Sequence, residues 1–293
     1  MASGTREARD PTERDRSLAS VDAAQPEVSI VIVTFGAREH VLRCLSSIAD
    51  HAAIDHEAIV VDDGSSDGTV VAVRERFPDV RVIAKPRNEG LVAGRNTALE
   101  LVRGRLVLML DADTELRPGA LQALVAVLDG DPRVGLVGPR LVGPDGELQL
   151  TCRRFPPFLI PLMRRGPYAR IDPDPAAHRR HMMVDFDHTS ERPVVWVSGA
   201  AQMWRRSLID RVGEYDRRVS SYGGEDLDWC LRVWEAGLEV HYAPQAEIVH
   251  HWQQVTRQNL YSRKSFRALR DWYYLQYKHR RLRRDPRMKQ ANA

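Results

Sequence analysis

Short apolar runs alternate with stretches of helical periodicity over residues 27–140, and this alternation constrains the fold more than any other feature. Val28–Thr34 is apolar on both faces, as expected of a strand that is covered on both sides. The same pattern predicts strands at Glu57–Val61, Val80–Ala84, Arg105–Leu110 and Val134–Val137, and helices at Arg38–Asp50, Asp67–Phe77, Leu91–Val102 and Pro118–Leu128. Strand–helix units with short connections predict an α/β fold: a Rossmann-like, mainly parallel central sheet with helices on both faces.

The rest of the chain differs from this pattern. Residues 1–26 are polar and predicted to be disordered, with no apolar stretch of the kind a signal peptide needs. Residues 141–192 are rich in Pro, Arg and His and predict an irregular insertion or lid. Regular patterns return in residues 193–256, and residues 257–293 form a separate basic tail. Within residues 193–256 we expect a helix at Leu227–Ala236. We also expect three short strands, at Val194–Val197, Val240–Tyr242 and Ile248–His250.

The charge of the chain is concentrated at its C-terminal end. Residues 257–293 contain twelve Lys and Arg against two acidic residues, although the whole chain has a net charge of only +3. A mildly acidic body with a basic end does not resemble a nucleic-acid-binding protein with a basic groove, so no nucleic-acid partner is expected. The tail also carries several aromatic residues, which suits peripheral contact with an anionic membrane. The alternative is a helix that packs its aromatics on the core and exposes its basic face.

Cysteine content and hydropathy bear on the location of the chain. Three widely separated cysteines argue against a disulfide framework and against a cysteine-ligated metal. No apolar run is long enough to span a membrane. We therefore expect a cytoplasmic protein, or one peripheral at the inner face of the plasma membrane.

Two aspartates follow the strand predicted at Arg105–Leu110. Because strand side chains alternate, Asp111 and Asp113 point the same way, and they lie at the carboxyl edge of the sheet, where open α/β folds bind ligands. Hard divalent cations take oxygen ligands and are often shared between carboxylates and a diphosphate, so the pair is a candidate Mg²⁺ or Mn²⁺ site. The alternative is a turn in which both carboxylates accept hydrogen bonds from loop amides.

A second acidic cluster ends the strand predicted at Glu57–Val61. Asp62 and Asp63 precede glycines that let a ligand approach the backbone, and their carboxylates can accept hydrogen bonds from a base or ribose. Asp67 is the expected helix cap, and a purely structural capped loop is the alternative. Arg95, just inside the helix predicted at Leu91–Val102, is expected to neutralise phosphate or to pair with Asp62 or Asp63; a plain surface arginine is the alternative.

Together these motifs resemble a known enzyme family. VSIVIVTF, VVDDGSSDGT, NEGLVAGRN and MLDAD, in this order, are similar to the family 2 glycosyltransferases of the GT-A fold. The later GGEDLDWCLR and IVHH stretches look like that family's acceptor-side acidic motif and late histidine, so the resemblance runs over about residues 28–255. Arg154-Phe155-Pro156 is similar to a stretch of the rhamnosyltransferase branch.

The resemblance implies a function and a set of roles. It implies an inverting, metal-dependent transfer of a sugar, L-rhamnose from dTDP-rhamnose being favoured, to a hydroxyl of a glycan or polyprenyl-linked acceptor in cell-envelope polysaccharide synthesis. It implies Asp226 as the catalytic base, with Glu225 orienting or binding the acceptor. The small residues Gly199 and Ala200 are a candidate floor beneath the acceptor, with tight strand packing as the alternative. It implies a metal held by Asp111 and Asp113, with His250 or His251 completing the shell. The residues it implies for donor binding are Thr34, Asp62, Asp63, Arg95, Asp111 and Asp113.

On this basis residues 27–140 form the nucleotide-sugar-binding half and residues 193–256 the acceptor-binding half. The alternatives are a UDP-sugar-dependent enzyme of the same fold, a nucleotidyltransferase, and a catalytically silent scaffold at the membrane edge. No GxGxxG or Walker-type phosphate loop follows any predicted strand. The intact acidic pairs argue against a silent relative. For Glu225 and Asp226 the structural alternative is helix capping. For His250 and His251 the alternative is that they are ordinary polar residues at a strand end.

Overall fold

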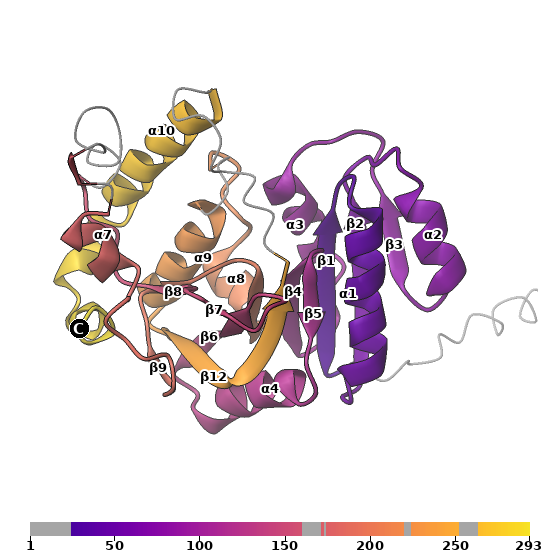
Figure 1. Cartoon of the computed structure of the whole chain (residues 1–293), viewed down its shortest axis with the longest axis horizontal. Helices are drawn as coiled ribbons and strands as arrows, with labels where there is room; N and C mark the ends of the chain where they lie inside the picture. The colour runs from indigo at the N-terminus through magenta and orange to yellow at the C-terminus, as the bar shows by residue number, and fades with distance from the viewer. Residues whose placement is uncertain (1–24, 160–170, 173, 220–223, 252–262) are drawn as a thin grey trace, which may run out of the picture.

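The structure is a computed structural model, and it describes residues 25–159, 171–172, 174–219, 224–251 and 263–293 (Figure 1). Residues 1–26, predicted to be disordered, lie almost entirely outside these ranges. The described residues form a ten-stranded sheet with strand order β3-β2-β1-β4-β11-β6-β12-β5, to which β7 and β9 add at the sides. A separate pair, β10 (Trp196–Val197) with β8 (Cys152–Arg153), lies outside this sheet.

The first half of the sheet is parallel, as the sequence predicts. β1 (Val28–Thr34) pairs with β2 (His56–Asp62) on one side and β4 (Leu106–Asp111) on the other, and β3 (Arg81–Ala84) pairs with β2. The register places Thr34 beside Asp62, and Val33 beside Asp111. Because parallel strands end at the same edge, these residues are brought together. The connecting helices are α1 (Arg38–His51), α2 (Thr69–Arg76) and α3 (Leu91–Leu99).

The second half of the sheet is mixed. β11 (Ala201–Arg205) lies antiparallel between β4 and β6 (Val134–Val142), and the sequence pattern misses it. β12 (Glu239–His250) is one long strand parallel to β6, not the two predicted; an irregularity between Ala243 and Glu247 interrupts its register. The remaining partners are β5 (Thr114–Leu116) and β9 (Arg192–Pro193) along β12, and β7 (Leu148–Gln149) along β6.

Helices cover both faces of the sheet, and each face has its own core. Alternation along β1 directs Val31 into one core with Trp229 and Trp234 of α9 (Gly224–Glu235), and Ile30 and Ile32 into the other with α1 and α4 (Ala120–Gly130). Figure 1 shows α1 near the front of the parallel half, with α9 and the short helix α8 (Leu208–Val212) in the left half of the view.

The C-terminal segment folds back onto α9. It consists of α10 (Arg263–Lys278), the 3₁₀ helix η2 (Arg280–Arg284) and α11 (Pro286–Ala291). Leu275, Leu282 and Met288 are buried in the same core as α9. Lys278 and the fully buried His279 both bind the Asp228 carboxylate of α9, at 2.6 and 2.8 Å. The tail therefore packs on the core through these aliphatic residues and, in part, Tyr274, while the aromatic side chains of Phe266 and Tyr277 remain exposed. Among the described helices, none combines the length and apolar character needed to span a bilayer.

The described part of residues 141–192 is more regular than the sequence predicts. It contains β7, β8 and α7 (Ala176–His181), and it is joined to the C-terminal end of the chain. Arg154 forms a two-pronged pair with Asp185 and donates to the Ala293 carbonyl, and the Asn292 side chain accepts from the Phe155 amide. This segment is therefore held by long-range contacts that local periodicity does not reveal.

Candidate active site

Two buried oxygens without partners lie where β1 and β2 end. Asp62 uses Oδ1 to accept from the Ser65 amide at 2.9 Å, but its Oδ2 has no hydrogen-bond partner, nor has Thr34 Oγ1, among the residues that the structure describes. Both residues are almost fully buried. Because buried polar atoms are normally satisfied, this pair points to a ligand at the strand ends.

Asp63 is committed to its own loop. Its carboxylate accepts from the amides of Glu89 and Gly90 and binds the Lys85 ammonium at 2.9 Å. Of the two aspartates, Asp62 thus has the oxygen left for a ligand. Asp67 is not the expected cap, because Gly68 is the N-cap of α2; Asp67 lies one residue earlier and accepts from the Thr69 amide at 3.1 Å and from the Arg38 amide. Lys85 was missed from the sequence; its position just after β3 was the signal for it.

Asp111, Asp113 and His250 form the metal-ligand cluster of the described residues. One ligand atom from each lies within 4.8 Å of the others, and His250 Nε2 is 3.5 Å from Asp113 Oδ1. The other ring nitrogen of His250 contacts Gln149 Oε1 at 2.7 Å, which fixes the orientation of the ring. Two carboxylates and an imidazole fit a divalent ion such as Mn²⁺, and the carboxylates also suit Mg²⁺.

The two late histidines, His250 and His251, have different partners. His251 does not join the aspartates: its Nε2 binds Glu115 Oε1 at 2.6 Å, beside α1. Successive residues at a strand end point to opposite faces, so only one of the pair can face Asp113. The structure therefore does not support the expectation that His251 is an alternative metal ligand; of the two histidines, His250 is the one that lies with Asp111 and Asp113.

Glu225 and Asp226 begin α9 and are both buried. Asp226 Oδ2 accepts from the Gly199 amide at 2.7 Å, and its Oδ1 accepts from the Leu227 amide at 2.7 Å. A side chain at Gly199 would meet Asp226 Cβ at 3.0 Å and the Arg95 guanidinium at 3.1 Å, so a larger residue would have to displace one of them by a few tenths of an ångström. The Asp226 carboxylate is thus held by one amide of its own helix and one from the segment before β11.

Gly199 and Ala200 lie at a buried junction between β4 and α9. The Ala200 carbonyl accepts from the Asp111 amide at 2.9 Å, and the Gly199 amide donates to Asp226 at 2.7 Å. These residues thus connect the end of β4 to the start of α9, and their role as a floor beneath an acceptor stays a prediction.

Arg95 joins the two acidic groups. Its guanidinium is 3.3 Å from Asp111 Oδ1, 3.6 Å from Glu225 Oε1, and donates to the Gly199 carbonyl at 3.1 Å. It is only 1% exposed and lies over the ring of Tyr215, 5.6 Å from its centroid. The expected pairing of Arg95 with Asp62 or Asp63 is wrong, and so is its reading as a surface residue. Nothing in the sequence around Tyr215 indicated this contact.

Burial sets the protonation of the carboxylates around Arg95. Burial, and then the charge of Asp226, raises the pKa of Glu225 well above its usual value. Burial likewise raises the pKa of Asp226 and of Asp111, against the lowering effect of Arg95. Adjacent buried carboxyls cannot both ionise easily, so the pair holds a proton into a higher pH range than free carboxyls do. This is the property of a group that exchanges protons near neutral pH.

Comparison with known proteins identifies relatives of the chain. The family model for glycosyl transferase family 2 matches residues 29–188. An N-acetylglucosaminyl-diphospho-decaprenol L-rhamnosyltransferase of Mycobacterium tuberculosis is 30% identical over 236 residues, covering 76% of this chain and 75% of the relative. A pre-mycofactocin glycosyltransferase of the same organism is 34% identical over 204 residues, covering 66% of this chain and 37% of that protein.

Solved structures share the fold at lower identity. The mannosyltransferase PcManGT from Pyrobaculum calidifontis, solved with GDP-Man and Mn²⁺, has a TM-score of 0.54 at 21% identity, over 80% of this chain and 59% of that one. GalNAc-T7, solved with UDP, GalNAc and Mn²⁺, has a TM-score of 0.61 at 17% identity, over 87% of this chain and 48% of that one. The chain spans less than two thirds of either protein, and these likenesses show the GT-A fold.

Proposed function

Because the chain belongs to glycosyl transferase family 2 and is a glycosyltransferase, we propose that it moves L-rhamnose, with inversion, from dTDP-rhamnose to a hydroxyl of a polyprenyl-diphosphate-linked saccharide in cell-envelope polysaccharide synthesis. The donor and the acceptor class rest on the similarity to the mycobacterial L-rhamnosyltransferase, whose name gives a diphospho-decaprenol substrate. Residues 27–140 then bind the nucleotide sugar and residues 193–256 the acceptor.

On the donor side, we assign the base and ribose to the ends of β1 and β2. The Asp62 Oδ2 and Thr34 Oγ1 atoms are buried and lack partners among the described residues, so a ligand with hydrogen-bonding groups offsets their desolvation. Asp63 holds the neighbouring loop in place through its contacts with Lys85 and with the backbone amides that precede α3.

Asp111, Asp113 and His250 are the residues we assign to Mn²⁺ or Mg²⁺. When bound, the ion neutralises charge on the departing diphosphate. Arg95 keeps Asp111 oriented from the buried side, and Gln149 keeps His250 oriented from the other.

On the acceptor side, Asp226 is the proposed base. The acceptor oxygen bonds to the anomeric carbon, the bond from that carbon to the diphosphate oxygen breaks, and the hydroxyl proton passes to Asp226. Attack from the face opposite the leaving group inverts the anomeric carbon. Two backbone amides fix the carboxylate of Asp226, and Glu225 beside it, with its raised pKa, is suited to donate a hydrogen bond to the acceptor.

One observation carries the proposal: the single guanidinium of Arg95 contacts both Asp111 and Glu225. A donor whose diphosphate binds at Asp111 and Asp113 therefore lies beside a buried carboxyl pair able to take a proton.

The test is a thermal-shift screen of the protein with dTDP-, UDP- and GDP-sugars in the presence of Mn²⁺ or Mg²⁺. We expect dTDP-rhamnose to give the largest stabilisation and Asp113→Ala to lose it. Asp79→Ala changes an exposed aspartate just before β3, at the opposite edge of the sheet from Asp62, and should behave as the parent protein. NMR of the product should show the inverted anomer. Stabilisation by a UDP-sugar alone would replace the proposed donor, and a retained anomer would refute the mechanism.

A further inference from the structure

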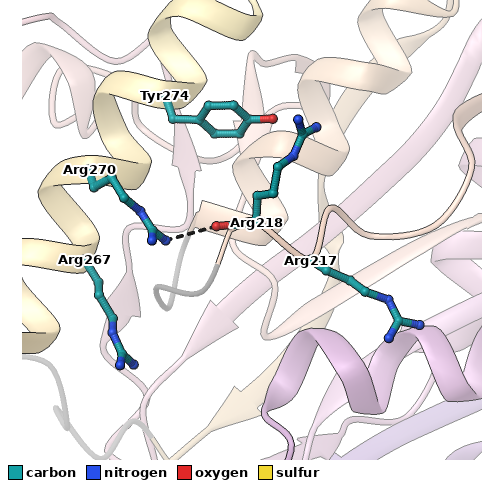
Figure 2. Close-up of a pocket in the computed structure, with 5 residues that line it drawn as sticks. All are labelled: Arg217, Arg218, Arg267, Arg270 and Tyr274. Atoms are coloured by element: carbon teal, nitrogen blue, oxygen red, sulfur yellow. Dashed lines mark hydrogen bonds between the residues drawn. The ribbon is translucent and has the colours of Figure 1, made fainter.

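A pocket of about 540 Å³ is lined by four arginines and one tyrosine, outside the site described above. Arg267, Arg270 and Tyr274 lie along one face of α10, at the spacing that brings helical side chains together. Arg217 and Arg218 line the pocket from the segment between α8 and α9; in Figure 2 the Arg218 side chain extends toward Tyr274, and that of Arg217 points away from α10. Arg270 donates to the Arg218 carbonyl at 3.0 Å, which ties the two walls together.

The charges of this arginine pocket are only partly compensated. Arg218 forms a two-pronged pair with Asp216, at 2.8 and 2.9 Å, and Arg217 has a looser contact of 3.6 Å with Glu214. A guanidinium has five N–H donors, so the pair with Asp216 leaves most of the donors of Arg218 for a further anion. Arg267 has no ion pair with a carboxylate in the described part of the chain.

The pocket is connected to the proposed acceptor site through Tyr215. The Asn96 side chain holds the Tyr215 backbone by two hydrogen bonds, at 2.8 and 3.0 Å, and the Tyr215 ring stacks on Trp229 of α9. Arg217 follows two residues later, which limits its Cα to about 7 Å from that of Tyr215. Since Tyr215 also contacts Arg95, the pocket wall begins next to the groups around Glu225.

Two exposed aromatic side chains lie on or beside α10, the helix that forms one wall of the pocket. Phe266, directly before Arg267, is 62% exposed. Phe158 is 54% exposed and its ring lies 4.9 Å from that of Tyr273 on α10. A basic pocket beside exposed aromatics matches a ligand with a phosphate group at the end of a hydrocarbon chain.

We infer that the arginine pocket binds the diphosphate of the lipid-linked acceptor and so presents the attached saccharide to Asp226. The inference rests on the proposed function for the identity of the acceptor. Guanidinium groups bind phosphate oxygens in two-pronged geometry, and several of them around one pocket suit a diphosphate better than a single carboxylate.

A second basic groove provides the internal comparison. It includes Arg281 and Arg284 and lies against Trp234 and Glu235, at the C-terminal end of α9. Asp226 is near the start of this helix of 12 residues, which spans about 18 Å. A diphosphate bound in the second groove would thus lie a helix length away from the proposed base.

The experiment compares two acceptors that carry the same sugar, one linked to a polyprenyl diphosphate and one to a neutral octyl chain, both in detergent. In Arg217→Glu/Arg267→Glu, we expect the preference for the diphosphate-linked acceptor, measured as the ratio of kcat/KM values, to fall at least about tenfold, by analogy with the loss of charge-assisted hydrogen bonds. Arg281→Glu/Arg284→Glu makes the same charge change in the second groove and should leave the ratio unchanged. Lysine at positions 217 and 267 should restore part of it.

Two results would overturn the inference: an unchanged ratio in the 217/267 variant, or an equal fall in the two double variants. A phosphatidylglycerol arm separates the sources of phosphate. If the 217/267 variant loses only its binding to vesicles of that lipid, while the acceptor ratio is unchanged, the pocket binds membrane phosphates and the acceptor assignment is wrong.

Binding of farnesyl diphosphate, measured without donor and in the presence of EDTA, tests the pocket independently of transfer. Binding that depends on Arg217 and Arg267 in a protein that transfers no rhamnose would support the pocket and refute the proposed function. If the protein transfers rhamnose but the 217/267 change leaves the binding of farnesyl diphosphate unaffected, the role of the pocket is refuted and the proposed function is not.

Discussion

Replacement of Arg95 by methionine tests the electrostatics of the site most directly. The guanidinium is fully buried and compensates Asp111 and Glu225 at 3.3 and 3.6 Å. Methionine retains much of the volume but leaves both carboxyls without their counter-charge. Removing one partner from a buried ion pair costs about 3–5 kcal/mol. We expect a loss of that size in the free energy of unfolding at pH 7.5, measured by urea denaturation.

The loss in unfolding free energy should depend on pH, and the pKa shifts fix the direction of that dependence. The pKa of Asp111 and of Glu225 is already raised by burial, so the folded state takes up protons at higher pH than the unfolded chain does. For such groups the cost of burial is present above the folded-state pKa and falls as the pH is lowered through it. Without Arg95 both pKa values rise further. The deficit of Arg95→Met should therefore shrink between pH 7.5 and pH 5.5.

The matched control is Arg133→Met, which removes a pair with Asp131 at the surface that is shorter, at 2.7 Å, than either contact of Arg95. This pair is exposed to solvent, so we expect no resolvable change in stability. Arg95→Lys, which keeps the charge but not the geometry, should fall between the parent and Arg95→Met. A deficit for Arg95→Met that is independent of pH, or no larger than that of the surface control, would refute the role of Arg95 as counter-charge.

Three further substitutions test other parts of the structure. Asp226→Asn should lower kcat by about 10²–10⁴ while thermal stabilisation by the donor is kept; a drop only in donor affinity would contradict its role as base. Burial alone would lower the pKa of His279, but the hydrogen bonds of its ring to Asp228 and Glu235 raise that pKa overall. The charged ring therefore stabilises the fold fully below about pH 6.5, and this stabilisation is lost as the pH rises through the folded-state pKa. In urea denaturation, His279→Gln should thus be destabilised more at pH 6 than at pH 9, and an equal deficit would exclude a charged His279. Gly64→Ala should lose about 2 kcal/mol or more, because φ is +85° and the new Cβ would lie 2.6 Å from the Arg87 carbonyl carbon; parent-like urea denaturation would contradict this backbone geometry.

The parallel half of the fold follows from local sequence pattern. Alternating apolar strands and amphipathic helices predict β1 to β4 within one or two residues, and the same logic places Asp62 and Asp111 at one edge. β11 escapes this logic, since Ala201–Arg205 contains Gln202 and Arg205 and reads as neither a buried strand nor an amphipathic one. Gln202 is nevertheless buried, because its side chain donates to the Val197 carbonyl at 2.9 Å.

The partners of Arg95 illustrate why the rest of the site is not predictable from local pattern. The sequence places Arg95 at the same sheet edge as Asp62 and Asp63, and proximity in the chain favours that pairing. Its actual partner Gly199 is 104 residues away and is brought in only because β11 pairs antiparallel with β4. That pairing also sets Ala200 against Asp111 and so delivers the start of α9 to the metal-ligand cluster. The missed strand is thus the element that joins the two halves of the site. Substitutions that weaken β11 should therefore impair the Glu225 and Asp226 side before they disturb Asp62 and Thr34, which β1 and β2 hold by themselves.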